Sequence, residues 1–426
     1  MTALPAARAL RRALRAAVVP LAVTAGLLLT GAPASATGTT PADITWSTAN
    51  SVATGDQDNA AVSATRNGYT AVVWEDDRDT ATPTDPVHTD VFLRLYKDEV
   101  SLYEKKISTG GTGNWRHWQP DVALHEDGTA VVVWSEDPDG NGFYNIAVRS
   151  VSTAGTVTGT GKANASSAGQ QFEPAVAADP DGTGFAVVWE DVQTGAQATV
   201  RAAGFSSISV KTYEAQVNTT GGQHHRPDVA LGAAGNAIVV WDEDTDANGF
   251  YQIGLKLLTP AGGVKLAQTA ANASGGGQQR AATVAANFNG DFAVAWETDH
   301  TGTARAATRS FTAAGTPRTT TDRTVTDDGT AVGPQSAPRV GIDDQLALVV
   351  SWVDGSDVWA RGFNPDGTVT GRLPTLRVNA TATGRQDEPA LGVSPWGEVT
   401  VAFTDDQDGN GFDQVYLGTG LVNSTW

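Results

Sequence analysis

Three segments of the chain repeat one pattern of oxygen-bearing residues around a tight turn, Asp-x-Asp-x-Asn-Gly-Phe. Oxygens at positions one, three and five, glycine at six, a backbone carbonyl at seven and an amide at nine match most of a calcium-binding loop of the EF-hand type. The chain therefore predicts three structural calcium sites, although the glutamate expected at position twelve is absent from all three. Plain hairpin loops turned by Asn-Gly remain the alternative. The predicted ligands are Asp137, Asp139, Asn141, Phe143 and Asn145; Asp244, Asp246, Asn248, Phe250 and Gln252; and Asp406, Asp408, Asn410, Phe412 and Gln414.

A second set of acidic residues follows a regularly spaced aromatic residue by two positions. Gathered around one pore, these carboxylates would repel one another, which would raise some of their pKa values and attract a cation. Carboxylates that cap hairpin turns are the alternative. The set is Asp76, Glu136, Asp191, Glu243, Asp354 and Asp405, with Thr298 at the seventh position.

Amide, histidine and arginine side chains precede the segment that begins each repeat. Such side chains suit sugar recognition, because planar polar groups bind hydroxyls. The candidates for acid–base catalysis are His117, His224, His225 and Arg226. His117 and the His224–His225 pair belong to the second and fourth repeats, so a shared metal or acid–base pair is not expected. Exposed polar loops without a ligand are the alternative.

These segments are positioned by a repeat of about 55 residues. In each copy a small or apolar residue is followed twelve or thirteen positions later by an aromatic residue that ends an apolar run. The aromatic residues are 60, 55, 52, 55, 56 and 51 residues apart. They are Trp74, Trp134, Trp189, Trp241, Trp296, Trp352 and Phe403.

One repeat contains four predicted strands. In the second copy, residues 120–124 alternate as a strand, Asp127-Gly128 forms a turn, and residues 130–134 (AVVVW) form a buried strand. A third strand is expected over 144–151 and a fourth ends near Asn164. Four antiparallel strands repeated radially describe the blades of a β-propeller, with each tryptophan packed between neighbouring blades.

The two ends of the chain are complementary fragments of this repeat. Residues 43–50 resemble a fourth strand with no strands before it, and the last repeat has three strands, around 389–393, 398–403 and 412–417. The N-terminal strand is therefore predicted to complete the C-terminal blade and to remove exposed sheet edges. An open β-solenoid or a string of small sandwiches would leave this complementarity unexplained. We expect an all-β, seven-bladed propeller over residues 37–426.

Residues 1–36 have the features of a secretory signal peptide: four arginines, an apolar stretch over 16–29 and the cleavage site Ala34-Ser35-Ala36. Arg11-Arg12 leaves the twin-arginine route open beside general secretion. The whole chain has a net charge of −19, and loss of these arginines makes it −23. This charge excludes nucleic acid as an expected partner. The absence of cysteine excludes disulfides and thiolate chemistry.

The units from Gly169 to Trp189 and from Gln223 to Trp241 resemble a repeat found in large secreted bacterial proteins. Their shared pattern is G-Q-x-x-P-x-V-A followed by V-V-x-W, with D-x-D-x-N-G loops in some copies. The resemblance covers nearly all of the chain after residue 36 and implies an extracellular, seven-bladed propeller-like protein. It implies no catalytic residues, because no single activity is attached to this repeat.

Two functions are compatible with these observations. The main prediction is a secreted, monomeric, non-catalytic propeller, stabilised by calcium, that binds an extracellular glycan or protein. The binding face would be the loop-rich rim, formed by the loops before the first and after the second strand of each repeat. The alternative is a polysaccharide lyase or glycoside hydrolase on the same scaffold, because the candidate residues include bases, proton donors and cations.

Overall fold

The computed structural model describes residues 44–79, 88–110, 116–180, 182–193, 197–219, 221–326, 333–365, 367–370 and 372–423. Contacts divide the chain into residues 1–37 and residues 38–426. The predicted signal peptide, residues 1–36, lies outside the described residues. No helix within the described ranges is both long enough and apolar enough to cross a membrane.

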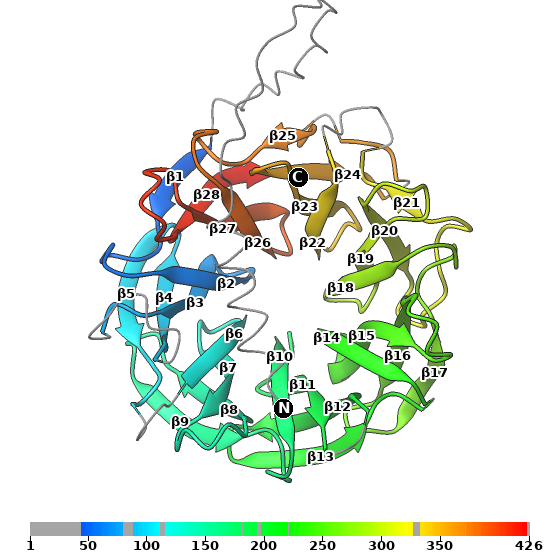
Figure 1. Cartoon of the computed structure of the whole chain (residues 1–426), viewed down its shortest axis with the longest axis horizontal. Helices are drawn as coiled ribbons and strands as arrows, with labels where there is room; N and C mark the ends of the chain where they lie inside the picture. Colours follow the sequence, from blue (N-terminus) through cyan, green and yellow to red (C-terminus); the bar gives the residue numbers. More distant parts are fainter. Residues whose placement is uncertain are drawn as a thin grey trace, which may run out of the picture. The chain divides into compact units, whose positions relative to one another are not determined.

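The described residues of the larger unit form seven antiparallel sheets of four strands each, arranged in a ring (Figure 1). This confirms the predicted seven-bladed β-propeller. The first strand of each blade lies nearest the axis of the ring and contacts the first strands of the neighbouring blades. These inner strands are β2 (Gln57–Ala64), β6 (Arg116–Leu124), β10 (Gln170–Ala178), β14 (Gln223–Gly232), β18 (Gln279–Ala286), β22 (Gln335–Ile342) and β26 (Gln386–Val393).

The second and third strands form the buried middle of each blade. The second strands are β3 (Tyr69–Asp76), β7 (Ala130–Asp137), β11 (Phe185–Val192), β15 (Asn236–Asp244), β19 (Phe292–Thr298), β23 (Leu348–Asp354) and β27 (Glu398–Asp405). The third strands are β4 (Asp90–Lys97), β8 (Asn145–Val151), β12 (Thr199–Ser207), β16 (Gln252–Leu258), β20 (Arg305–Phe311), β24 (Asp357–Phe363) and β28 (Gln414–Val422). A 3-10 turn, η1 (Ala233–Gly235), joins β14 to β15.

The outer edge of each blade is its fourth strand. These strands are β5 (Val100–Lys106), β9 (Val157–Lys162), β13 (Val210–Gln216), β17 (Val264–Ala270), β21 (Arg323–Thr324), β25 (Leu376–Arg377) and β1 (Thr45–Thr48). β21 and β25 contain only two residues each, shorter than the repeat predicts. Isolated bridges, Phe311 with Pro317 and Phe363 with Val369, continue the pairing of the third strand in these two blades.

The ring is closed as the sequence predicts. β1 pairs antiparallel with β28, with Thr45 opposite Thr419 and Thr48 opposite Tyr416. The indole nitrogen of Trp46 also donates to the carbonyl of Val378 at 2.7 Å. The seventh blade therefore contains strands from both ends of the chain.

The repeated aromatic residues lie between blades. Trp74, Trp134, Trp189, Trp241 and Trp296 are fully buried, and Trp352 and Phe403 are 1% exposed. Seven apolar clusters each span two neighbouring blades; one contains Trp74 of the first blade with Ala390, Val415 and Leu417 of the seventh. The core is thus a ring of similar interfaces, as the repeat predicts.

Every inner strand contains a β-bulge at one repeat position. The register with the second strand shifts there in all seven blades. The central residue of each bulge has a φ of 50° to 54°, although none is glycine. This left-handed conformation costs a non-glycine residue about 1–2 kcal/mol, so it requires support from its neighbours. The seven residues are Asn59, Gln119, Glu173, Arg226, Ala281, Ala337 and Glu388.

That support comes from side chains of the preceding blade. Glu75 accepts a hydrogen bond from the backbone nitrogen of Gln119 at 2.7 Å. Gln119 in turn accepts one from the nitrogen of Glu173 at 3.0 Å, and Glu297 accepts one from that of Ala337 at 2.9 Å. The bulges therefore connect adjacent blades around the axis.

Candidate functional site

The first and second strands of the third and fourth blades bring five ionisable side chains together. Two come from the third blade, on β10 and β11, and three from the fourth, on β14 and β15. Each influences the ionisation of at least one other member. We call this set the axial cluster: Glu173, Glu190, His225, Arg226 and Asp242.

Glu190 and His225 form a carboxylate–imidazole pair across the two blades. The Nδ1 atom of His225 lies 2.8 Å from Oε1 of Glu190. Burial alone would lower the pKa of His225, but the hydrogen bond and negative charge of Glu190 raise it overall. The side chain of Glu190 is 4% exposed and that of His225 is 29% exposed. Solvent therefore reaches the pair through the imidazole.

Glu173 occupies the bulge of β10, next to this pair. Its neighbour Phe172 lies opposite Glu190 in the β10–β11 ladder. Burial, followed by the charge of Glu190, raises the pKa of Glu173 to about 7. Its Oε2 atom is buried and accepts no hydrogen bond from the described residues. These surroundings favour the protonated acid near neutral pH.

Arg226 occupies the equivalent bulge of β14 and provides the cation of the cluster. Its Nε atom donates to Oδ2 of Asp242 at 2.6 Å, yet its side chain remains 46% exposed. Asp242 also accepts the backbone nitrogen of Ala281 at 3.1 Å, so it serves as a structural connector as well. Tyr251 packs beside the cluster, with its ring centroid 5.9 Å from that of His225.

The four predicted catalytic candidates separate into two pairs. His225 and Arg226 lie in the axial cluster. His117 and His224 are each only 1% exposed and lie outside the axial cluster. His117 packs edge-on against Trp134 and lies 2.9 Å from the carbonyl of Thr89, and burial lowers its pKa.

His117 and His224 occupy a structural position of the repeat. Each lies two residues before the bulge residue, where the other blades have a buried glutamine. Where glutamine is present, it bonds within its own blade: Gln386 donates to Asp405 at 2.9 Å. The two histidines therefore occupy the position at which the other blades have a glutamine that stabilises the blade.

The acidic set two residues after the aromatic positions does not form one ring. Oδ2 of Asp76 accepts the indole N–H of Trp74 at 2.8 Å, and Glu243 accepts that of Trp241 at 3.1 Å. Other members accept from the buried glutamine of their own blade, as Asp405 does. Burial raises the pKa of Asp405 to about 6. These hydrogen bonds hold each of these carboxylates to side chains of its own blade.

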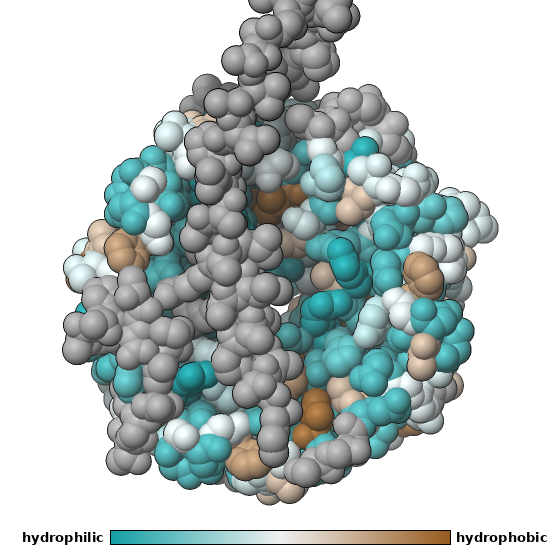
Figure 2. All heavy atoms as spheres, in the orientation of Figure 1, coloured by the Kyte–Doolittle hydropathy of each residue, from teal (hydrophilic) through white to brown (hydrophobic). Residues whose placement is uncertain are grey.

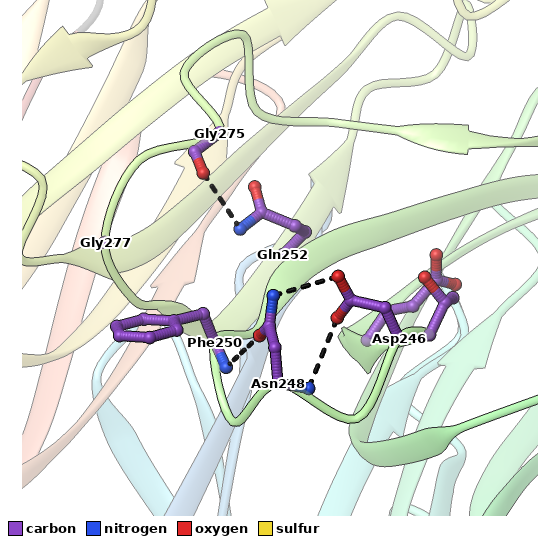
Figure 3. Close-up of a pocket in the computed structure, with 8 residues that line it drawn as sticks. Asp246, Asn248, Phe250, Gln252, Gly275 and Gly277 are labelled. Carbon is purple, nitrogen blue, oxygen red and sulfur yellow. Dashed lines mark hydrogen bonds between the residues drawn. The ribbon is translucent and has the colours of Figure 1, made fainter.

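The three predicted calcium loops share one conformation. In the fourth blade, Asn248 donates from its backbone and side chain to Asp246, and its Oδ1 accepts the nitrogen of Phe250 at 2.7 Å (Figure 3). The first aspartate, Asp244, accepts the nitrogens of Asn248 and Gly249 at 3.2 and 2.9 Å. This curvature suits ligation by the oxygens of positions one, three, five and seven.

The ninth-position amides have other partners. Asn145, Gln252 and Gln414 each accept a hydrogen bond from an asparagine at the blade junction, at 2.9, 2.8 and 2.6 Å. Among the described residues, no three His, Asp or Glu side chains are grouped as a metal would require. Each loop would thus offer two carboxylates with amide and carbonyl oxygens, and the calcium sites remain a prediction.

Glu173, Glu190 and Asp242 were absent from the sequence-based candidates. Glu190 and Asp242 directly follow the repeated tryptophan, so strand alternation places them on the opposite face from it. Aligning the seven repeats shows Glu75 and Glu297 at the same position. The alignment identifies a polar position that faces the axis, although it does not distinguish Glu190 from its structural counterparts.

The described part of the face in Figure 2 is mostly hydrophilic, with separate hydrophobic patches. The exposed large apolar side chains include Phe143 and Phe250, each at the tip of a predicted calcium loop and 45% and 53% exposed. A polar surface with isolated rings suits a hydroxyl-rich ligand better than an apolar one.

Comparison with solved structures finds propellers of distant sequence. A protein of unknown function from Dyadobacter fermentans aligns with a TM-score of 0.52 and 12% identity, over 73% of this chain and 96% of its own. The polysaccharide lyase Uly1 aligns with a TM-score of 0.52 and 11% identity, over 86% and 89%. A Hadza microbial sialidase, Hz136, gives 0.47 and 12%, over 78% and 73%. At these identities the similarity shows the fold alone. No family model and no curated protein match the chain.

Proposed function

We propose that the protein hydrolyses glycosidic bonds of an extracellular polysaccharide at the axial cluster. The observation that carries the proposal is the grouping of the partly exposed Glu173, whose surroundings raise its pKa to about 7, with the Glu190–His225 pair and the partly exposed Arg226. Glycoside hydrolysis requires one group that donates a proton to the leaving oxygen and another that activates water. Carbohydrate-active proteins among the solved propellers are consistent with this alternative to pure binding.

Each member of the cluster has a role in this proposal. Glu173 donates a proton to the glycosidic oxygen, because its raised pKa keeps it protonated up to about pH 7. His225, held by Glu190, accepts a proton from the attacking water once the imidazole is neutral. Arg226 binds substrate hydroxyls with the donors that Asp242 leaves free. Activity should therefore have a bell-shaped pH dependence, with losses at low pH where His225 is protonated and at high pH where Glu173 is ionised.

Charge favours a neutral substrate over a uronate polymer. The chain has a net charge of −19, and with Glu173 protonated the axial cluster holds two carboxylates, Glu190 and Asp242, beside Arg226. A polyanion would be repelled by both. A lyase acting on uronates also needs a cation to neutralise the substrate carboxylate, and Asp242 already pairs with Arg226. Glycoside hydrolysis is therefore the better match.

Secretion and structural calcium complete the proposal. The features of residues 1–36 support export, and the three identical loops support calcium ions that stabilise the loop-rich rim. These ions would be held by Asp137, Asp139, Asn141 and the carbonyl of Phe143, and by the corresponding groups of the other two loops. Their role is to fix loop geometry, and no catalytic step involves them.

The test is a screen of neutral and anionic polysaccharides for released reducing ends, with the unsaturated product of a lyase measured in parallel. Glu173→Gln should lower kcat about 100-fold or more on any substrate found, because the amide cannot donate the proton. Glu388→Gln is the matched control, since Glu388 occupies the same bulge position in the seventh blade.

Three results would count against the proposal. One is full activity in Glu173→Gln, and another is an equal loss in the Glu388→Gln control. The third is binding of a glycan with no cleavage of any polymer, which would restore the non-catalytic interpretation.

A further inference from the structure

A groove of about 520 Å³ lies on the fourth blade, outside the axial cluster. Its walls are the β15–β16 loop, which carries one predicted calcium motif, and the glycine-rich segment between β17 and β18. We propose that this groove is a binding subsite for a neutral sugar unit of the polysaccharide chain. The lining includes Glu243, Asp246, Asn248, Phe250, Gln252 and Gly275.

The groove combines an exposed ring with hydrogen-bond acceptors. Phe250 is 53% exposed and extends from the loop beside Asn248 (Figure 3). Asp246 and Asn248 are held by hydrogen bonds within the loop, and Gln252 donates to the carbonyl of Gly275 at 3.4 Å. The polar side chains are therefore fixed before a ligand arrives, which lowers the entropic cost of binding.

The second blade has larger side chains than the fourth at two equivalent positions. These are Lys162 and Ser167, and the ammonium of Lys162 donates to the hydroxyl of Ser167 at 2.6 Å. The fourth blade has Ala270 and Gly275 in their place. Smaller residues thus stand beside the groove in the fourth blade, although both calcium-type loops have the same pattern.

The chemistry of the lining selects the ligand. A sugar ring can stack its C–H face on Phe250 while its hydroxyls donate to the carboxylate of Glu243. Glu243 is not one of the predicted calcium ligands, so its charge remains to repel a uronate or a sulfated sugar. The volume lies in the range typical of small-ligand sites and accommodates one or two sugar units.

Tyr251 connects the groove to the axial cluster. It directly follows Phe250, and its ring centroid lies 5.9 Å from that of His225. Its backbone nitrogen donates to Gln278 at 3.1 Å, which holds the loop against the segment that forms the other wall. A chain bound in the groove would therefore extend past Tyr251 towards Glu173 and His225. In this respect the inference rests on the proposed function.

Binding can be tested without hydrolysis. The full chain carrying Glu173→Gln would be titrated with cello-, xylo-, manno-, galacto- and arabino-oligosaccharides, with oligogalacturonate as the anionic comparison. We expect at least one neutral oligosaccharide to bind, and Phe250→Ala to weaken it about tenfold. Phe143→Ala, the same loop position in the second blade, is the control and should leave affinity unchanged.

A second variant fills the groove with side chains and keeps the aromatic ring of Phe250. Ala270→Lys with Gly275→Ser installs the pair found in the second blade. The backbone allows it, because a Cβ on Gly275 would meet only Gln252, at 3.7 Å. This variant should fold with an unchanged Tm and lose binding.

The outcomes distinguish this subsite from the catalytic proposal. Failure of every neutral oligosaccharide to bind would overturn it, as would equal affinity in Phe250→Ala and its parent, or tighter binding of oligogalacturonate. Binding that depends on Phe250 in a protein that cleaves nothing would support the subsite and refute hydrolysis alone.

Discussion

Replacing Glu173 by glutamine should change the stability of the protein in a way that depends on pH. Burial and the charge of Glu190 raise the pKa of Glu173 to about 7 in the folded protein, from an ordinary value of 4.5. A carboxyl group whose pKa is higher in the folded protein than in the unfolded chain makes its full contribution to stability below about pH 4.5. That contribution is lost as the pH rises to about 7. The variant has no such titration.

The size of the effect follows from the shift. A difference of about 2.5 pKa units corresponds to about 3.5 kcal/mol, at about 1.4 kcal/mol per unit. The wild-type protein should therefore lose about 3.5 kcal/mol relative to Glu173→Gln between about pH 4.5 and pH 8. Coupling of Glu173 to Glu190 spreads this loss over the whole interval, and does not confine it to one sharp step.

Urea unfolding of both proteins across that pH range measures the difference. Asp98→Asn, in which the replaced side chain is 71% exposed, controls for the removal of one negative charge. A stability difference between wild type and Glu173→Gln that stays constant with pH would refute the assignment of Glu173 as a protonated acid. So would the same pH dependence in the Asp98 control.

Three further predictions concern the scaffold. Deleting residues 44–48 removes β1 and exposes the edge of β28, so we expect aggregation by light scattering; a stable monomer with an unchanged Tm would contradict the closure argument. A chelator should lower the Tm by several degrees and added calcium should restore it, whereas an unchanged Tm would remove calcium from the account. Asn272→Ala deletes the acceptor of the buried Ile253 nitrogen and should cost about 2 kcal/mol in urea unfolding; a loss no larger than that of the exposed Ala273→Ser would count against this role.

The fold could be predicted from the sequence because the pattern of apolar and aromatic residues repeats in every blade. One tryptophan ends a buried strand in six blades, and Phe403 does so in the seventh, which sets the period and the interface together. The incomplete first and last repeats then required the pairing of β1 with β28. The short β21 and β25 were not predicted, because the repeat leads to outer strands of similar length in every blade.

The candidate site could be predicted only in part from the sequence. His225 and Arg226 were found from residue type, but His117 and His224 share that type and differ in the face to which they point. The seven bulges decide this, and they have no signal in composition, since glutamate, glutamine, arginine, asparagine and alanine all adopt the same positive φ. The pairing of Glu190 with His225 depends on two blades that only the folded ring brings together.

The bulges also have a consequence for how this scaffold can be altered. Each provides one residue that lies outside the ladder pairing, so its chemical type can change while the strands around it keep their register. The ring thus has seven equivalent positions that already hold five different residue types. Ala281 and Ala337, in the fifth and sixth blades, are the two without a functional group. Acids, bases or metal ligands could be introduced at these two positions without redesign of the sheets. The propeller is therefore a suitable scaffold for engineering a new active site.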